Sequence, residues 1–437
     1  MADYFDLLCS EIGRVGVQAR IGRVAEVSRG TLRVVGFGLA ARLGDRVIIK
    51  SGRDIGGEVL RLSDAGCIIL PDGNLEGIAM GETVALVGTA EVAPDDSWIG
   101  RIVDAFGQPL DGRALMRGAV ARDIRANPPA AVKRKRLGGR LSTGVAVFDT
   151  LLPLVCGQRI GLFAGSGVGK SSLLARFARG VAADVVVIAL VGERGRELRE
   201  FTERVLGAEG MARSVIVAAT SDQSALVRRR CAWTAMAVAE HFRDQGLQVL
   251  FLVDSVTRFA EAHREVALAA GEEASLAGFP PSTSSLIMGL AERAGPGPEG
   301  AGDITAVFSV LVAGSDMDGP VADILRGVLD GHVVMDRKIA ERGRYPAIDL
   351  LRSVSRSLPE AATPDENLLI ADARRLLGVW DRAELMIQAG LYAKGSDAQV
   401  DEAIKVWPAL DGFLAEMAPA DGVEGSFQRL KECLGRK

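Results

Sequence analysis

Five continuous apolar runs in the middle of the chain constrain its fold more than any other feature of the sequence. Longer segments with helical patterning separate the runs, which read RIGLFAG, DVVVIALVG, SVIVAAT, QVLFLVD and ITAVFSVLVAG. Strands that are apolar on both faces and are joined by helices form mostly parallel sheets that are covered on both sides. We therefore expect an α/β domain with a mostly parallel sheet over residues 93–360.

Different patterns flank this region. Between about Gly22 and Gly88, short β-branched runs such as RVAEVS, TLRVV and DRVIIK alternate with glycine-containing turns, which predicts a small closed β-barrel over residues 19–92. The proline-rich and basic segment PPAAVKRKRLGGRLSTG, residues 128–144, is interpreted as a linker. After about Pro364 the pattern is helical and charged, so we expect a helical domain over residues 361–437.

The composition excludes several classes of protein. A chain of 437 residues, 48% hydrophobic and 25% charged, is long enough for two or three globular domains. Its net charge of −4 gives no general attraction to nucleic acid or to anionic membranes. The start MADYFDLL lacks a basic signal-peptide region and no apolar run is long enough to span a membrane, so we expect a cytoplasmic protein. The five cysteines lie far apart, which indicates reduced thiols rather than disulfides or a zinc site.

The segment AGSGVGKS, residues 164–171, follows the apolar run RIGLF and precedes the helical segment SLLARFARG. It matches the phosphate-binding pattern G-x-x-x-x-G-K-[ST] except at its first position, where Ala164 replaces glycine. Such a loop directs backbone N–H groups at phosphate oxygens beside a helix N-terminus. Lys170 is predicted to reach the terminal phosphates of ATP, and the Ser171 hydroxyl to bind Mg²⁺. The predicted nucleotide-binding residues of this segment are Ala164, Gly165, Ser166, Gly167, Val168, Gly169, Lys170, Ser171 and Ser172.

Two acidic residues lie at the ends of predicted strands. Asp254 ends the run VLFLVD, so its carboxylate is expected to face the phosphate loop and to bind Mg²⁺. Glu193 ends the run VVVIALVGE, and we interpret it as the catalytic base or the water-orienting residue. The alternative is that Glu193 belongs to a surface charge cluster with the segment RGRELRE that follows it.

Longer blocks of sequence resemble a known family. The blocks occur in one order over about residues 20–410 and read AGSGVGKSSLL, GERGREL, DSVTRFAEAHREVALAAGE, GFPPS, ERAG, ILRGVLDGH, RYPAIDLLRSVSR and AKGSD. Together they resemble the type III export ATPases, most closely the flagellar export ATPases, which are similar in turn to the catalytic subunits of rotary ATP synthases. The resemblance implies a RecA-like ATPase domain and a homohexameric ring that couples ATP hydrolysis to delivery and unfolding of exported proteins. It also accommodates Ala164, because the export ATPases are similar at that position.

The resemblance also assigns two site residues. Tyr345, in the block RYPAID, would stack on adenine. Arg356, in RSVSR, would enter the catalytic site of a neighbouring subunit and act there with the Lys170 and Glu193 of that subunit. A packed turn residue is the alternative for Tyr345, which stands beside a proline. A surface arginine in a polar loop is the alternative for Arg356.

Several partners follow from the same resemblance. It implies self-association, contacts with a regulatory or stator protein and with export gate components, and binding of export substrates and chaperones. Binding to the export apparatus would place the protein peripherally at the inner membrane. The N-terminal segment 1–18 presents Phe5, Leu8, Ile12 and Val15 on one helical face, and this face is equally compatible with docking of a regulator and with packing on the barrel.

Other functions stay open on the sequence alone. A virulence injectisome ATPase would carry the same blocks, and rotary ATP synthase subunits and RNA-translocating hexameric helicases have similar cores. A synthase subunit is disfavoured because this chain carries a full catalytic set, and a helicase because Phe37 is the one aromatic residue between residues 20 and 90. The basic runs Lys133–Arg136 and Arg228–Arg230 are interpreted as a solvated linker and a charged helix face, so we expect no nucleic acid partner.

Overall fold

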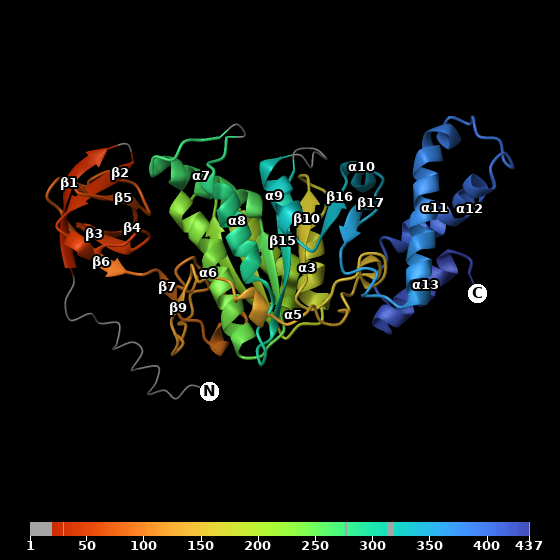
Figure 1. Cartoon of the computed structure of the whole chain (residues 1–437), viewed down its shortest axis with the longest axis horizontal. Coiled ribbons are helices and arrows are strands. Elements are labelled where there is room, and N and C mark those ends of the chain that lie inside the picture. The colour runs from red at the N-terminus through yellow and green to blue at the C-terminus, as the bar shows by residue number, and fades with distance from the viewer. Residues whose placement is uncertain (1–19, 29, 276–277, 313–318, 437) are drawn as a thin grey trace.

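Three parts of the chain follow one another along the longest axis of the computed structural model (Figure 1). The structure describes residues 20–28, 30–275, 278–312 and 319–436. A β-barrel begins the described chain, an α/β sheet forms its middle, and a group of helices ends it. The amphipathic segment 1–18 lies outside the described residues, so both interpretations of that segment stay predictions.

The barrel closes in the strand order β1-β2-β5-β4-β3-β6. Alternate side chains of a strand point inward, so Leu32 and Val34 of β2 and Val47 and Ile49 of β3 are fully buried. Phe37 packs in the same core and offers no exposed ring on which a base could stack. The predicted closed barrel is thus confirmed. Its elements are β1 (Arg20–Ser28), β2 (Thr31–Val35), the short helix η1 (Gly38–Ala40), β3 (Arg46–Ser51), β4 (Arg53–Ser63), β5 (Gly66–Pro71) and β6 (Thr83–Gly88).

The central sheet contains all five predicted apolar runs as neighbouring parallel strands. Its strand order is β17-β16-β10-β15-β13-β11-β12-β8, and β14 pairs with β15. Strand β17 is antiparallel to β16 at one edge. The strands are β8 (Arg101–Val103), β10 (Arg159–Ala164), β11 (Val185–Glu193), β12 (Ser214–Thr220), β13 (Val249–Asp254), β14 (Gly295–Pro296), β15 (Asp303–Leu311), β16 (Gly331–Met335) and β17 (Ile348–Ser355), while β7 (Glu91–Val92) and β9 (Arg122–Asp123) pair separately. The predicted α/β class with a mostly parallel sheet is confirmed.

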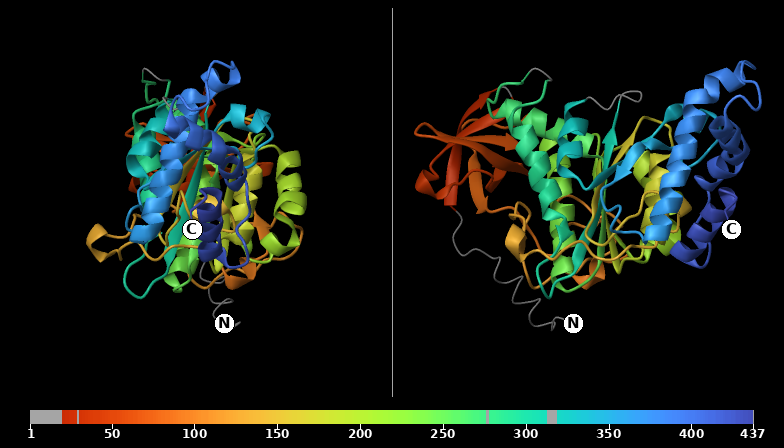
Figure 2. Two further views of the ribbon diagram at one scale, coloured as in Figure 1. Left: turned by 90° about the vertical axis from the view of Figure 1, so that its right-hand side faces the viewer. Right: turned by 45° about the vertical axis from the view of Figure 1, so that its right-hand side comes forward.

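Helices cover both faces of this sheet (Figure 2). Along β11, Val186 and Ile188 belong to the core that contains α3, whereas Val185 and Val187 belong to the core that contains α6. This alternation explains why the strand is apolar at every position. The helices of this part are η2 (Asp96–Trp98), η3 (Ala131–Lys133), α2 (Ala146–Asp149), α3 (Lys170–Gly180), α4 (Gly195–Glu200), the π-helix η4 (Phe201–Leu206), α5 (Gly207–Met211), α6 (Ala225–Asp244), α7 (Val256–Ala269), α8 (Ser282–Arg293), α9 (Pro320–Val328) and α10 (Arg337–Glu341).

The last part of the chain is helical, as the sequence predicts. It consists of α11 (Pro364–Gln388), α12 (Ala398–Phe413) and α13 (Gly422–Cys433). A capping box starts α11, because the Thr363 hydroxyl accepts from the Glu366 amide at 3.3 Å and the Glu366 carboxylate accepts from the Thr363 amide at 2.8 Å. Trp380 of α11 stacks on Trp407 of α12 with 4.7 Å between ring centroids, which joins these two helices.

The interpretation of Lys133–Arg136 as a solvated linker is wrong at its centre. The Arg134 guanidinium donates to the Ala294 carbonyl at 2.9 Å, and the Lys135 ammonium donates to the Ala301 carbonyl at 2.7 Å. Both side chains therefore bind the connection around β14, and residues 128–144 are attached to the central part.

The interpretation of Arg228–Arg230 as a charged helix face is also wrong. Arg229 and Arg230 are buried, each only 6% exposed. The Arg229 guanidinium donates to the Glu58 carboxylate of the barrel at 2.8 Å, and the Arg230 guanidinium lies 4.8 Å from the centroid of the Phe106 ring. The physical reason is that α6 packs against another part of the chain, which local periodicity does not reveal.

Two further observations bear on the composition. Within the described ranges, every helix is too short or too polar to cross a bilayer. Cys67, Cys156, Cys231 and Cys433 are free thiols, and Cys9 lies outside the described residues.

Candidate functional site

The phosphate-loop segment joins the carboxyl end of β10 to the start of α3. Ala164 is the last residue of β10 and is fully buried, so an extended strand residue stands where the strict pattern has glycine. Gly167 and Gly169 have φ angles of 79° and 88°, in the left-handed region that favours glycine. Gly169 is the N-cap of α3, and no side chain caps the first amides of that helix. This loop and helix start therefore present the N–H groups that an anion requires.

Lys170 and Asp254 come together at this edge of the sheet. The Lys170 ammonium donates to the carboxylate of Asp254, which ends β13. Ser309 of the neighbouring strand β15 donates to the same carboxylate oxygen at 2.9 Å. Asp254 is only 4% exposed, so the lysine and the hydroxyl stabilise a carboxylate that has lost most of its water.

Glu193 lies at the end of β11, next to β13 in the sheet. Burial raises the pKa of Glu193 to about 7, and the neighbouring Asp254 carboxylate and a hydrogen bond with the Glu197 side chain act in the same direction. The charge of Lys170 acts in the opposite direction. A carboxyl group with a pKa near neutrality is suited to accept a proton at physiological pH.

These residues line an open cleft and a hollow beside it. The cleft has a volume of about 650 Å³ and a second hollow of about 290 Å³ shares several residues with it. Of the predicted residues, the cleft brings together Gly165, Ser166, Gly167, Gly169, Lys170, Ser171, Ser172 and Glu193, and the hollow adds Asp254. Ala164 and Val168 are buried, and their side chains pack in the hydrophobic core rather than lining the cleft.

Sequence reasoning missed several residues of this cleft, among them three polar or charged side chains. The sequence pattern does not single out Thr257 and Arg258, and it places Glu197 only in a surface charge cluster, yet all three line the cleft. The Arg258 guanidinium pairs with the Glu261 carboxylate at 3.1 Å. A usable signal existed for the first two, because they follow Asp254 within one helical turn and α7 begins directly after that strand end.

The hollow beside the cleft is lined by oxygen atoms of the kind that Mg²⁺ prefers as ligands. The Ser171 hydroxyl and the Asp254 carboxylate line the same hollow. Across the part of the chain that the structure describes, no group of three or more His, Cys, Asp or Glu side chains is arranged to hold a metal ion. Magnesium bound through few protein oxygens takes its other ligands from phosphates and water. These residues therefore fit a Mg²⁺ ion accompanied by ATP.

Tyr345 lies beside the phosphate loop. It follows α10, and a Cβ atom added to Gly169 would come within 3.1 Å of Cδ1 of the Tyr345 ring. The side chain is 46% exposed, so it is not a fully packed turn residue. An exposed aromatic face next to a phosphate loop is available to stack on a base.

Arg356 lies at the opposite end of the sheet from the phosphate loop. Ser355, the residue before it, pairs with Gly331 at the start of β16, whereas Ala164 pairs with Met335 at the end of β16. Four strand steps between these pairs correspond to about 13 Å. The structure therefore does not bring Arg356 into the cleft of its own chain.

Two family models match the chain. The nucleotide-binding domain of the ATP synthase alpha/beta family matches residues 144–355, and the T3SS EscN ATPase C-terminal domain matches residues 362–432. The first match contains the phosphate loop, both strand-end acids and Tyr345. The second covers α11, α12 and most of α13.

Similar proteins cover nearly the whole chain. The flagellum-specific ATP synthase of Caulobacter vibrioides is 43% identical over 437 residues, with 98% of each chain covered. The type 3 secretion system ATPase of Xanthomonas euvesicatoria is 41% identical, with 93% of this chain and 92% of that protein covered. Among solved structures, the assembled ATPase EscN in complex with its central stalk EscO, from the type III secretion system of enteropathogenic E. coli, has a TM-score of 0.86 at 35% identity. It covers 94% of this chain and 100% of the EscN chain.

Proposed function

The chain belongs to the family of type III protein export ATPases, and we propose that it works in the flagellar export apparatus as a homohexameric ring. ATP hydrolysis is the activity of this family, and the ring would couple it to delivery and unfolding of export substrates. The observation that carries the proposal is that the phosphate loop and Glu193 line one cleft, and that Asp254 lines the adjoining hollow, which shares Ser171, Ser172 and Glu193 with the cleft.

Each residue of the cleft has a role in this proposal. Backbone N–H groups of residues 165–170 hold the phosphates, and the Lys170 ammonium leaves Asp254 to contact the terminal phosphates. The Ser171 hydroxyl and the Asp254 carboxylate would hold Mg²⁺, which neutralises charge on the phosphate oxygens when it is bound. Tyr345 stacks on the adenine ring, supported by its position against Gly169.

Glu193 acts on the attacking water. Its carboxylate orients the water molecule and accepts its proton, and the raised pKa makes this acceptance favourable near pH 7. Glutamine at this position keeps the shape of the side chain but does not accept a proton. Glu193→Gln is therefore expected to bind ATP and to hydrolyse it very slowly.

Arg356 acts on a neighbouring subunit. A guanidinium at the far end of the sheet is too distant from its own phosphate loop to touch the same nucleotide, but it is exposed and would enter a neighbour's cleft. An arginine supplied in trans stabilises the transition-state phosphate charge by a factor of about 1000 or more. Hydrolysis would then depend on ring assembly.

Mixing two inactive variants tests the role of Arg356. Arg356→Ala keeps its cleft and Lys170→Ala keeps its arginine, so a mixed ring contains sites with an intact cleft and an intact neighbouring arginine. The mixture should regain activity well above the sum of the two variants. Mixed rings that form and stay inactive at every ratio would refute an arginine acting in trans.

The binding partners and the location of the ring are also proposals. By likeness to EscN, whose structure includes the central stalk EscO, we propose a stalk partner for this chain. Further proposed partners are a regulatory or stator protein, export gate components, substrates and chaperones, with peripheral association at the inner membrane and no role for nucleic acid. The domains proposed to carry these contacts are residues 19–92, 93–360 and 361–437.

A virulence injectisome ATPase is the second candidate function. The relatives named for the two systems are 43% and 41% identical to the chain, so identity favours the flagellar system only slightly. Deleting the gene in its own organism separates the candidates. Loss of flagellar filaments, restored by the wild-type gene and not by Lys170→Ala, is the expected result. Intact filaments with loss of injected proteins would instead support the injectisome.

A further inference from the structure

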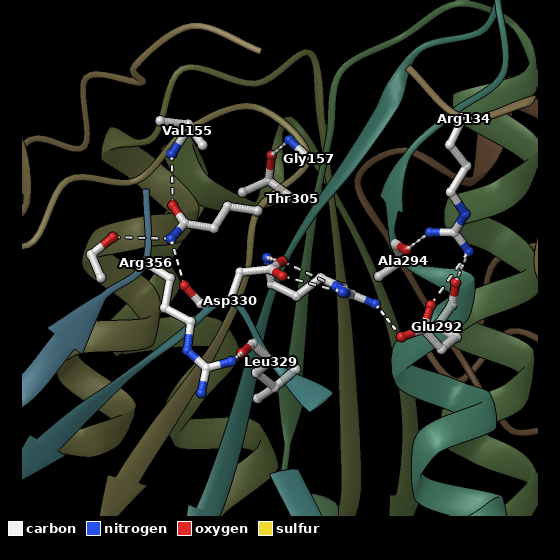
Figure 3. A network of polar contacts seen from close by, with 12 residues as sticks. Arg134, Val155, Gly157, Glu292, Ala294, Thr305, Leu329, Asp330 and Arg356 are labelled. Atoms are coloured by element: carbon white, nitrogen blue, oxygen red, sulfur yellow. Dashed lines mark hydrogen bonds and ion pairs between the residues drawn. The ribbon is translucent and has the colours of Figure 1, made fainter. Parts of the chain in front are cut away.

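The side chain of Arg356 is held by the carboxyl end of α9. Its Nη1 donates to the Leu329 carbonyl at 3.1 Å (Figure 3). Its Nη2 donates to the Arg326 carbonyl at 3.3 Å. The last carbonyls of a helix carry partial negative charge, which attracts a guanidinium. The backbone amide of Arg356 donates to the Asp330 carbonyl at 2.9 Å. The direction of this arginine therefore depends on where residues 326–330 lie.

Asp330 fixes that segment to the start of β10. Its carboxylate accepts from the Arg159 amide at 3.0 Å, from Arg159 Nε at 3.1 Å and from Arg159 Nη2 at 3.2 Å. The Asp330 amide donates to the Arg159 carbonyl at 2.8 Å. Charge-assisted, two-pronged contacts of this kind define an orientation as well as a distance. Figure 3 shows Asp330 between Arg356 on one side and Glu292 on the other.

A second contact ties the same point to β17. Gln158 Nε2 donates to the Asp330 carbonyl at 3.2 Å and to the Ser355 hydroxyl at 3.0 Å. The Ser355 hydroxyl donates in turn to the Pro153 carbonyl at 2.7 Å. Gln158 thus joins Asp330, in the turn after α9, to Ser355, the last residue of β17 and the residue directly before Arg356.

We propose that Asp330 is a positioning residue for Arg356, acting through its ion pair with Arg159. This proposal rests on the proposed role of Arg356 in a neighbouring subunit. The Asp330 carboxylate holds the turn between α9 and β16, the turn presents the carbonyls that hold the guanidinium, and the guanidinium is thereby aimed out of its own subunit. A displacement of about 1 Å of such a group lowers the rate by up to roughly 100-fold.

Asp330→Asn tests the ion pair with little change in shape. Arg159 keeps a second partner in this variant, because its Nη1 donates to the Glu292 carboxylate at 2.7 Å. The backbone contacts of residue 330 are also unchanged. We expect kcat to fall about 10- to 100-fold, while ADP affinity and KM for ATP stay close to those of the wild type, since the variant's own cleft is intact.

Asp111→Asn is the matched control. Asp111 forms the same kind of two-pronged pair, with Arg101 Nη2 at 2.8 Å and with Arg101 Nε, beside β8 at the other edge of the sheet. This variant loses an aspartate–arginine pair far from Arg356. Its kcat should stay within about twofold of the wild type, whatever it does to the melting temperature.

Mixed rings decide where Asp330 acts. Asp330→Asn mixed with Lys170→Ala should regain activity, because the intact cleft of the first meets a well-placed arginine of the second. Asp330→Asn mixed with Arg356→Ala should not, because neither subunit supplies a well-placed arginine. The opposite pattern would mean that Asp330 acts on its own cleft and would overturn the proposal. Wild-type kcat in Asp330→Asn, or no recovery with either partner, would overturn it equally.

The mixture of Arg356→Ala and Lys170→Ala distinguishes failure of the proposal for Asp330 from failure of the proposed role of Arg356 in a neighbouring subunit. If that mixture regains activity and the Asp330→Asn mixture with Lys170→Ala does not, Arg356 acts in trans but Asp330 does not position it. If the first mixture stays inactive, the role of Arg356 in trans is refuted, and the proposal for Asp330 with it.

Discussion

Replacing Glu193 by glutamine should stabilise the protein, and the gain should depend on pH. The Glu193 carboxyl has a pKa of about 7 in the folded chain, against an ordinary value of 4.5, chiefly because burial disfavours its charged form. The folded chain therefore holds a proton on Glu193 over a pH range in which the unfolded chain has lost it. This group's contribution to the free energy of unfolding is retained below pH 4.5 and is lost as pH rises through about 7. Glutamine has no charge to bury, so the variant avoids the loss.

The size of the effect follows from the shift. A full shift between these two values corresponds to about 3 kcal/mol, and screening by water at a half-buried carboxylate reduces this to roughly 1–2 kcal/mol. We expect the melting temperature of Glu193→Gln to exceed that of the wild type by a few degrees at pH 8.5.

Thermal unfolding of nucleotide-free and magnesium-free protein measures this difference. The gain should shrink to near zero at pH 4, below the ordinary pKa of 4.5, where Glu193 is largely protonated in both the folded and the unfolded chain. Glu200→Gln, at the exposed end of α4, is the control and should change the melting temperature little at either pH. A gain that is equal at both pH values, or a variant less stable than the wild type at pH 8.5, would refute the reasoning.

Three further predictions concern binding. Lys170→Ala should lose most of its ATP affinity because the charge on the phosphates is gone, whereas Glu193→Gln should bind ATP normally; equal loss in direct binding measurements would contradict the role of Glu193. Tyr345→Ala should raise KM for ATP by roughly 5- to 100-fold through lost stacking, while Tyr345→Phe should stay near the wild type, and an unchanged KM in the alanine variant would exclude an adenine contact. Deleting residues 1–18 should abolish pull-down of a regulatory partner and leave ATPase turnover and melting temperature nearly unchanged, whereas a large drop in melting temperature would favour packing on the barrel.

Local patterns in the sequence predicted the framework of the site. The apolar runs became neighbouring parallel strands because side chains buried on both faces leave no other arrangement for them. The phosphate loop took its expected conformation because glycines at positions 167 and 169 permit left-handed angles directly before a helix. Asp254 and Glu193 could be located for the same reason, since parallel strands bring their carboxyl ends to one edge.

Contacts between distant segments could not be predicted from the sequence. Arg229 and Arg230 read as a solvated face, yet they are buried because the barrel and the segment around Phe106 pack on α6. Glu197 read as a surface charge, yet it lines the cleft because α4 folds back beside the end of β11. In each case contacts with another element determine where the side chain lies, and local periodicity does not predict such contacts.

The sequence by itself determined a nucleotide cleft and its family, because both reside in contiguous motifs. Only the tertiary structure decided that Arg356 and the phosphate loop of one chain lie at opposite ends of the sheet, since the antiparallel pairing of β17 with β16 sets that direction. Only the tertiary structure joined Asp330 to Arg159 across 171 residues. Folding brings such residues together through strand order and register, which depend on packing of the whole sheet rather than on any single segment.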